Sequence, residues 1–145
     1  MDRDTNMRVK IINGPVARNP VAKAVARQKL KARLTSAKLR IFMLDPGVDD
    51  SEYLAPLMHV LLVIARAAEF QWPDTESMPV NERVSYNIIR GGCSAIESVL
   101  RRWDPAQAVA IEQAIDRAEM LNAKLRSECI YDANADLNLL VQEYR

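Results

Sequence analysis

Residues 53–70 read YLAPLMHVLLVIARAAEF, and this stretch decides the fold. All of its residues are aliphatic, aromatic, Met or Ala, except for Pro56, His59, Arg66 and Glu69. A surface helix shows a single apolar stripe, whereas a helix that is apolar on nearly every side is buried by its neighbours. A membrane span needs about 20 mostly apolar residues, and this run is shorter and interrupted. The sequence predicts a buried central helix over residues 52–71.

Further helices are predicted on both sides of this stretch. Apolar spacing and a Pro near each start indicate helices over residues 20–44, 79–103 and 105–144. Long helices with short connections and no credible strand predict an all-α fold, an antiparallel bundle of four to five helices around the central one. Residues 1–16 have no partner strand, so we expect a flexible N-terminal arm followed by a single helical domain over residues 17–145.

The helix predicted over residues 79–103 carries Gly91-Gly92 in its middle. Each Gly costs a helix about 1 kcal/mol relative to Ala, so the pair indicates a kink or the close approach of another helix. The apolar spacing places one set of residues on the packed face: Val84, Ile88, Gly92, Ala95 or Ile96, Val99 and Trp103.

The last helical stretch begins clearly and ends ambiguously. Asp104 suits the N-cap and Pro105 the first helical position. No Gly or Pro follows Pro105, so one helix could run to the end of the chain. Alternatively, Asp132 or Asn134 caps a separate final helix, which predicts a break within residues 132–136.

The charges are distributed unevenly along the chain. Residues 1–40 hold 11 Lys or Arg and 2 Asp, a net charge of +9, whereas residues 41–145 hold 9 Lys or Arg and 17 Asp or Glu, a net charge of −8. The helix predicted over residues 20–44 carries a basic row: Lys23, Arg27, Lys29, Lys31, Arg33, Lys38 and Arg40. This row suits phosphate neutralisation in nucleic acid, although the only ring near it is Phe42. It equally suits a protein partner or the chain's own acidic half. A membrane-surface helix would need Trp or Phe on its apolar side.

The groups that could support catalysis are few. His59 is the only histidine and lies in the most apolar stretch, so we expect a core or groove-edge histidine, with a general base as the alternative. Cys93 and Cys129 stand 36 residues apart without a CxxC motif, which predicts reduced, buried thiols. The acidic pairs are typical of solvated helix faces, and no phosphate-loop or nucleophile motif occurs. The sequence predicts no enzyme, no cofactor, and no catalytic, cofactor-binding or metal residues.

A group of aromatic and Arg residues is a second candidate binding feature. Trp and Arg are favoured as anchors of protein interfaces. Trp72, with Phe70 beside it, is expected to lie across from Arg101, Arg102 and Trp103. These residues are candidate interface anchors; the alternative is that they cap one end of the bundle.

Residues 18–24 read RNPVAKA. This run resembles the opening of small basic proteins of unknown role in tailed bacteriophages and prophages. The resemblance implies a phage-like origin in a bacterial cytoplasm, and action by binding and redirecting a host factor. We therefore expect a non-enzymatic helical protein that modulates or inhibits a host protein by protein–protein contact, without a membrane. The alternative is nucleic-acid binding through the helix over residues 20–44. Long exposed helix flanks would also suit a homodimer.

Overall fold

The computed structural model describes residues 20–41, 51–102 and 104–143. Within them the chain forms α1 (Pro20–Ile41), α2 (Ser51–Gln71), the short 3-10 helix η2 (Thr75–Ser77), α3 (Val80–Arg101), α4 (Pro105–Lys124) and α5 (Ser127–Glu143). No strand occurs in these residues. The prediction of an all-α helical bundle is confirmed. The predicted arm over residues 1–16 lies outside the described residues.

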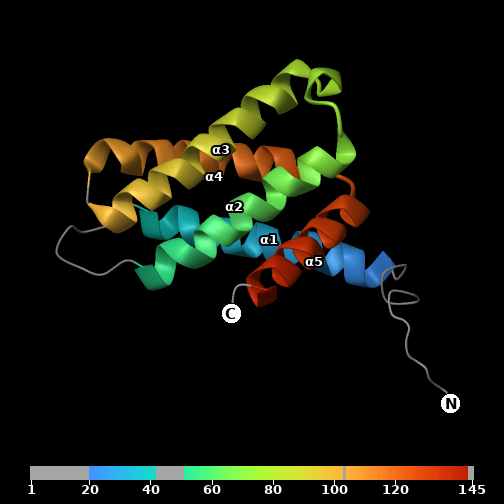
Figure 1. The fold of residues 1–145 in the computed structure, drawn as a ribbon, viewed down its shortest axis with the longest axis horizontal. Coiled ribbons are helices and arrows are strands. Elements are labelled where there is room, and N and C mark those ends of the chain that lie inside the picture. The colour runs from blue at the N-terminus through green and yellow to red at the C-terminus, as the bar shows by residue number, and fades with distance from the viewer. Residues whose placement is uncertain (1–19, 42–50, 103, 144–145) are drawn as a thin grey trace, which may run out of the picture.

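The helices lie in two layers. Figure 1 shows α2, α3 and α5 in front of α1 and α4. α3 and α4 run antiparallel and share the most extensive contact of any two helices. α1 packs against α4, α5 and α2, so the basic helix lies along the acidic second half of the chain.

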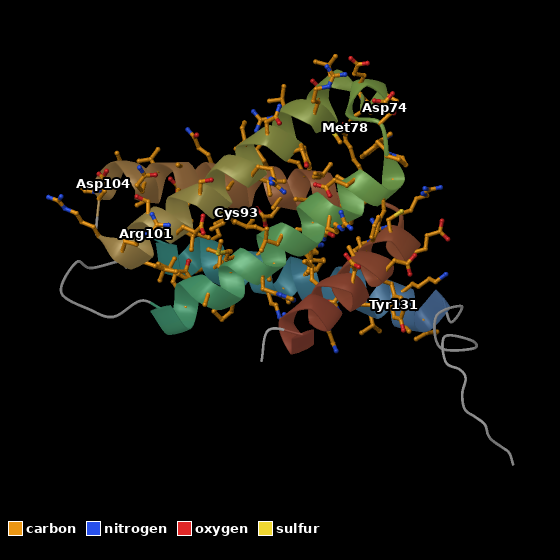
Figure 2. The ribbon with its side chains drawn as sticks, in the orientation of Figure 1. Asp74, Met78, Cys93, Arg101, Asp104 and Tyr131 are labelled. Atoms are coloured by element: carbon orange, nitrogen blue, oxygen red, sulfur yellow. The ribbon has the colours of Figure 1, made fainter. Side chains whose placement is uncertain are left out.

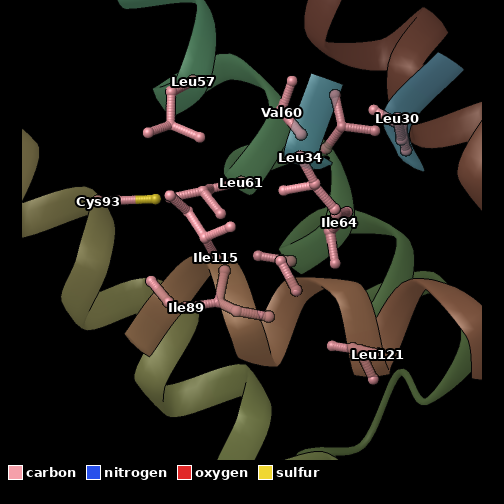
Figure 3. Close-up of a cluster of buried hydrophobic side chains, with 14 of the residues drawn as sticks. Leu30, Leu34, Leu57, Val60, Leu61, Ile64, Ile89, Cys93, Ile115 and Leu121 are labelled. Carbon is pink, nitrogen blue, oxygen red and sulfur yellow. The ribbon is translucent and has the colours of Figure 1, made fainter. Parts of the chain in front are cut away.

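α2 is the helix around which the others are arranged. It packs against all four of the other α-helices. Figure 3 shows Leu34 of α1, Leu61 of α2, Ile89 of α3 and Ile115 of α4 pointing into one cluster, and these four side chains have no exposed surface. The prediction of a buried central helix is confirmed, with its first residue at Ser51 instead of residue 52.

The same helix has the length and composition of a membrane span over Tyr53–Gln71, the one such candidate in the described part of the chain. Core helices of water-exposed bundles have these properties too, and half of this window is buried inside the bundle. Contacts with the rest of the chain therefore account for the apolar character of α2.

The start of α4 matches its prediction. Asp104 has extended backbone angles, and its Oδ1 accepts a hydrogen bond from the Ala106 N–H at 3.0 Å. Pro105 follows as the first helical residue, where its missing N–H removes no helical hydrogen bond. At the contact of α1 and α2, the Tyr53 hydroxyl donates to the Ala37 carbonyl at 2.7 Å and ties α2 to α1.

The close helix crossing predicted at Gly91-Gly92 is confirmed for one of the two glycines. A Cβ at position 92 would overlap the Cβ of Ala114, so α3 and α4 approach to backbone distance there. A Cβ at position 91 would meet nothing within 4 Å. Gly92 is therefore required by packing, whereas Gly91 faces outward.

The predicted face of α3 is wrong at its first two positions. Val84 is 42% exposed and Ile88 is only half-buried, whereas Ser85 and Ile89 are buried. The other buried residues of α3 are Gly92, Cys93, Ala95, Ile96 and Val99. The predicted face included all of them except Cys93. Apolar spacing failed here because the buried row begins with the small polar residue Ser85.

The predicted position of the last break is also wrong. α4 ends at Lys124 and α5 begins at Ser127, so the break at residues 125–126 lies six or more residues before the predicted one. Asp132 and Asn134 lie inside α5 instead of capping it. Leu125 has extended backbone angles, φ −78° and ψ 144°, although its sequence neighbours contain no Gly or Pro. Side chains from distant helices hold this turn, as described next.

Candidate binding surface on helix α1

Arg27, in the middle of the basic row, belongs to the fold. Its Nη1 donates to the carbonyl oxygens of Asn122 (3.0 Å) and Ala123 (3.2 Å), and its Nη2 donates to the Leu125 carbonyl and to Ser127 Oγ (3.0 Å). The last carbonyls of a helix have no intrahelical partner, and a cation there also complements the helix dipole. Arg27 therefore caps α4 and holds the α4–α5 turn, residues 124–127.

Gln71, the last residue of α2, holds the same turn from another side. Its Nε2 donates to the Lys124 carbonyl at 3.3 Å, and its Oε1 accepts from the Arg126 N–H at 2.6 Å. Both of these backbone groups lack a helical partner because α4 stops there. Four helices thus meet at the α4–α5 turn through two long polar side chains, Arg27 and Gln71.

Two further lysines of the basic row face acidic residues of the chain itself. Lys38 Nζ lies 3.0 Å from Asp116 Oδ1 and 3.4 Å from Glu119 Oε1, both on α4. Its hydrogen bond to Asp116 and then that to Glu119 raise the pKa of Lys38 above its usual value. Lys23 Nζ lies 4.0 Å from Glu128 Oε2 on α5. The alternative in which the basic front packs on the acidic back holds for this part of the row.

Lys29, Lys31 and Arg33 behave differently. All three are exposed, and no described carboxylate lies within ion-pair distance of them. Arg40 lies in α1, but its side chain is outside the described residues. The basic row is therefore divided between cations that stabilise the fold and cations that remain available to a ligand.

The available cations border two hollows beside α1. The α1–α2 hollow has a volume of about 410 Å³ and is lined mainly by apolar side chains, among them Tyr53, Pro56, Leu57 and Val60. The smaller α1–α5 hollow, of about 190 Å³, is lined by polar side chains: Lys29, Arg33, Asn134 and Asn138, with Ala26, Leu30, His59 and Ile130 around them. Among the described residues, no carboxylate lines either one.

His59 and Arg33 line both hollows and so form the boundary between them. His59 is half-buried, which agrees with the predicted groove-edge histidine. A general base of the usual kind is oriented by a carboxylate or another hydrogen-bond acceptor. The side chains that line the hollows with His59 include no Asp or Glu, and the charged ones, Lys29 and Arg33, are cationic. This arrangement suits binding of an anionic group.

The two cysteines are free and buried, as predicted. Burial raises the pKa of the Cys93 thiol to about 11, with smaller effects from Arg90, which lowers it, and Glu97, which raises it. A thiol with a raised pKa is a poor nucleophile at neutral pH. Figure 3 shows the Cys93 sulfur pointing from α3 toward Leu61 of α2. No cluster of three His, Cys, Asp or Glu side chains suitable for a metal ion occurs among the described residues.

One polar cluster was missed at the sequence level. Arg66 of α2 bonds to Asp136 of α5 (Nε to Oδ2, 3.0 Å) and to Glu69 (Nη1 to Oε1, 3.0 Å). Tyr86 of α3 donates to Glu69 Oε2 at 2.5 Å, and burial together with this bond raises the pKa of Tyr86. The only sequence signal was the i,i+3 spacing of Arg66 and Glu69. Since its charges are paired, we assign the cluster to holding α2, α3 and α5 together.

A third hollow, of about 220 Å³, lies between α3 and α4. Its lining includes Glu82 and Lys124, which form an ion pair across it with Nζ and Oε1 2.9 Å apart. Arg117 also lines this hollow and has no ion pair with a described residue, so the charges here are satisfied in part.

The predicted interface anchors do not form one group. Arg101 and Arg102 lie at the C-terminal end of α3, whereas Trp72 precedes its N-terminal end, and a helix of 22 residues is about 33 Å long. Figure 2 shows Arg101 and Asp104 at the opposite end of α3 from Asp74 and Met78. Trp72 is half-buried against the core, and Trp103 lies outside the described residues. Phe70 and Trp72 therefore do not face Arg101 and Arg102.

No protein-family model, curated protein or solved structure matches the chain. The resemblance of residues 18–24 to small phage proteins therefore stays a prediction.

Proposed function

We propose that this protein is a non-enzymatic binding protein that acts by protein–protein contact through α1. The observation that carries the proposal is the division of the basic row. Arg27 and Lys38 are held by acceptors of the fold, whereas Lys29, Lys31 and Arg33 are exposed beside open hollows. Exposed cations without an ion pair to the described residues, next to concave surface, suit an anionic partner.

The chemistry of the described side chains supports a binding role over a catalytic one. His59 shares its two hollows with cations and amides, and the Cys93 thiol is buried with a pKa of about 11. Among the described residues, neither group has a carboxylate or base beside it that would activate it for proton transfer or nucleophilic attack.

The phage resemblance of residues 18–24 extends the proposal to a biological setting. On that basis the protein is a phage-encoded modulator or inhibitor of a host protein in the bacterial cytoplasm, which engages its target through the free part of the basic row. A small all-α bundle with a cationic surface is compatible with such a role.

Nucleic-acid binding is the second candidate function. It is favoured by the exposure of Lys29, Lys31 and Arg33 on one helix, since such cations release counterions from phosphates. The internal pairing of Arg27 and Lys38 weakens this candidate, because it leaves fewer cations to follow a phosphate backbone.

The test compares two charge reversals of equal size. The tagged protein, its double variant Lys29→Glu/Arg33→Glu and the control variant Arg101→Glu/Arg102→Glu are each incubated with nuclease-treated bacterial lysate, and the retained proteins are identified. All four positions are exposed, so both variants should keep the circular dichroism spectrum of the wild type. We expect a protein partner that the wild type and the control variant retain and the α1 variant loses.

The opposite pattern would overturn the proposal. Loss of the partner in the Arg101/Arg102 variant alone would move the binding surface to the end of α3. Retention of proteins only from lysate that has not been treated with nuclease, with binding to nucleic acid that weakens steeply with salt, would favour the second candidate function.

A further inference from the structure

The α1–α2 and α1–α5 hollows share two lining side chains, Arg33 and His59. A ligand that enters one hollow therefore touches side chains that also border the other. Their walls differ in chemistry, which means that a single ligand must present two kinds of group at short separation.

The α1–α2 hollow selects an apolar group. Tyr53, Leu57 and Val60 are buried side chains on its α2 wall, and Pro56 adds exposed apolar surface. Ala37 closes the α1 side. Its volume of about 410 Å³ exceeds what one aliphatic or aromatic side chain occupies, so a Leu or Phe of a partner can enter.

The α1–α5 hollow selects an anion. Lys29 and Arg33 of α1 supply positive charge, and Asn134 and Asn138 of α5 supply amide donors from the opposite wall. The guanidinium of Arg33 can bind a carboxylate with two parallel hydrogen bonds. No acidic side chain of the described residues lines this hollow, so none of them competes with a bound carboxylate.

We propose that the two hollows together recognise a short acidic segment of a partner protein, with an apolar side chain seated between α1 and α2 and a neighbouring carboxylate on Arg33 and Lys29. This inference rests on the proposed function, because it assumes that α1 contacts a protein, and it adds the chemical class of the bound segment.

A nucleic acid satisfies only half of this site. A phosphate could bind Arg33 and Lys29, but a base needs an aromatic face on which to stack. The described residues that line the hollows offer two rings: Tyr53, which is 9% exposed and whose hydroxyl is held by the Ala37 carbonyl, and the half-buried imidazole of His59. Neither ring is fully exposed. Aliphatic walls suit an apolar amino-acid side chain better than a base.

The experiment measures binding of three labelled probes to the full chain by fluorescence anisotropy. The first is a short peptide with one central Leu between Asp and Glu residues, the second has Ala in place of that Leu, and the third is a single-stranded oligonucleotide of equal charge. We expect the Leu peptide to bind at least about tenfold more tightly than the other two, which corresponds to about 1.4 kcal/mol.

Two variants locate the site. Arg33→Gln should weaken binding of the Leu peptide about tenfold, because it removes the guanidinium that would bind the carboxylate. Ser36→Trp, at an exposed position that lines the α1–α2 hollow, should abolish the difference between the Leu and Ala peptides by filling the space. Arg101→Gln is the matched control at the far end of α3 and should bind like the wild type.

Equal binding of the Leu and Ala peptides, or tighter binding of the oligonucleotide, would overturn the inference. If neither peptide binds while capture of a protein from lysate still depends on Lys29 and Arg33, the proposed protein–protein contact stands. Only the assignment of an acidic segment with an apolar side chain is then wrong. If lysate capture does not depend on these cations, both fall.

Discussion

The α3–α4 hairpin and the α1 side of the bundle are built by different means. α3 approaches α4 at Gly92 until backbone and Cβ atoms touch, and this crossing is apolar. α1 is attached to α4 and α5 through the long side chains of Arg27 and Lys38. A hollow of about 220 Å³ lies between α3 and α4 as well, but the ion pair of Glu82 and Lys124 spans it, whereas Lys29 and Arg33 beside α1 have no ion pair with a described carboxylate. This difference in charge pairing, and not in space, favours α1 as the candidate binding surface.

The largest effect should come from adding one carbon at the hairpin crossing. Gly92→Ala places a Cβ against Ala114, which forces the two backbones apart. Overpacking of this kind costs about 2–3 kcal/mol, and we expect that loss in the free energy of unfolding from urea titration. Unchanged stability would mean that the hairpin is looser than the α1 side, which would reverse the comparison.

The next largest effect should come from cutting the attachment of α1. Arg27→Met keeps the length and helix propensity of the side chain but leaves the carbonyls of Asn122 and Ala123 without their donor. We expect a loss of about 2 kcal/mol in the same titration. Arg27→Lys keeps the charge but lacks the planar guanidinium. Its free energy of unfolding should lie between those of Arg27→Met and the wild type.

The buried thiol of the hairpin should make stability depend on alkaline pH. Burial raises the pKa of Cys93 from about 9 to about 11, so above pH 9 the unfolded chain releases this proton while the folded chain keeps it. Stability contributed by the neutral thiol is therefore complete below about pH 9 and declines as the pH rises toward 11. At pH 10 the linkage amounts to about 1 kcal/mol.

Cys93→Ala is the control for this pH dependence. The unfolding free energy of wild type and variant should be compared at pH 8 and pH 10, and the wild type should lose more. Parallel curves would show that the Cys93 sulfur reaches solvent.

Gly91→Ala should act in the opposite direction to its neighbour. Position 91 faces outward with open space around a Cβ, so the substitution removes the helix cost of Gly without a clash. We expect a gain of about 0.5–1 kcal/mol in unfolding free energy. A loss would indicate that a partner or a second copy contacts the outer face of α3.

The smallest effect on stability should come from the free part of the basic row. Arg33→Met removes an exposed guanidinium that has no described ion-pair partner, so we expect a change below about 0.5 kcal/mol. It is the matched control for Arg27→Met, because both replace an Arg of α1 with the same residue. Equal losses in the two variants would contradict the division of the row.

The features that could be predicted are those set by nearby residues. The apolar run of α2, the Asp104-Pro105 start of α4 and the tight crossing at Gly92 follow from periodicity, capping and the lack of a side chain. Each of them depends on residue types a few positions apart. Local rules were therefore sufficient to identify the all-α bundle and its central helix.

The features that failed depend on residues far apart in the chain. The end of α4 is held by Arg27 and Gln71, and no local turn signal marks it. Which face of α3 is buried depends on its packing against α4, and the small polar residue Ser85 belongs to that buried face. The basic row could be identified, but which of its cations are paired depends on acceptors 78 to 105 residues away.

The capping of α4 by Arg27 has a consequence for the order of events during synthesis. The acceptors of Arg27 lie 95–100 residues further along the chain, so this bond cannot form until the α4–α5 turn has left the ribosome. α1 is synthesised before α4 and α5, so its cations are exposed to the polyanions of the cell until its docking site has formed. Emergence of the α4–α5 turn is then the event that withdraws Arg27 and leaves Lys29, Lys31 and Arg33 exposed.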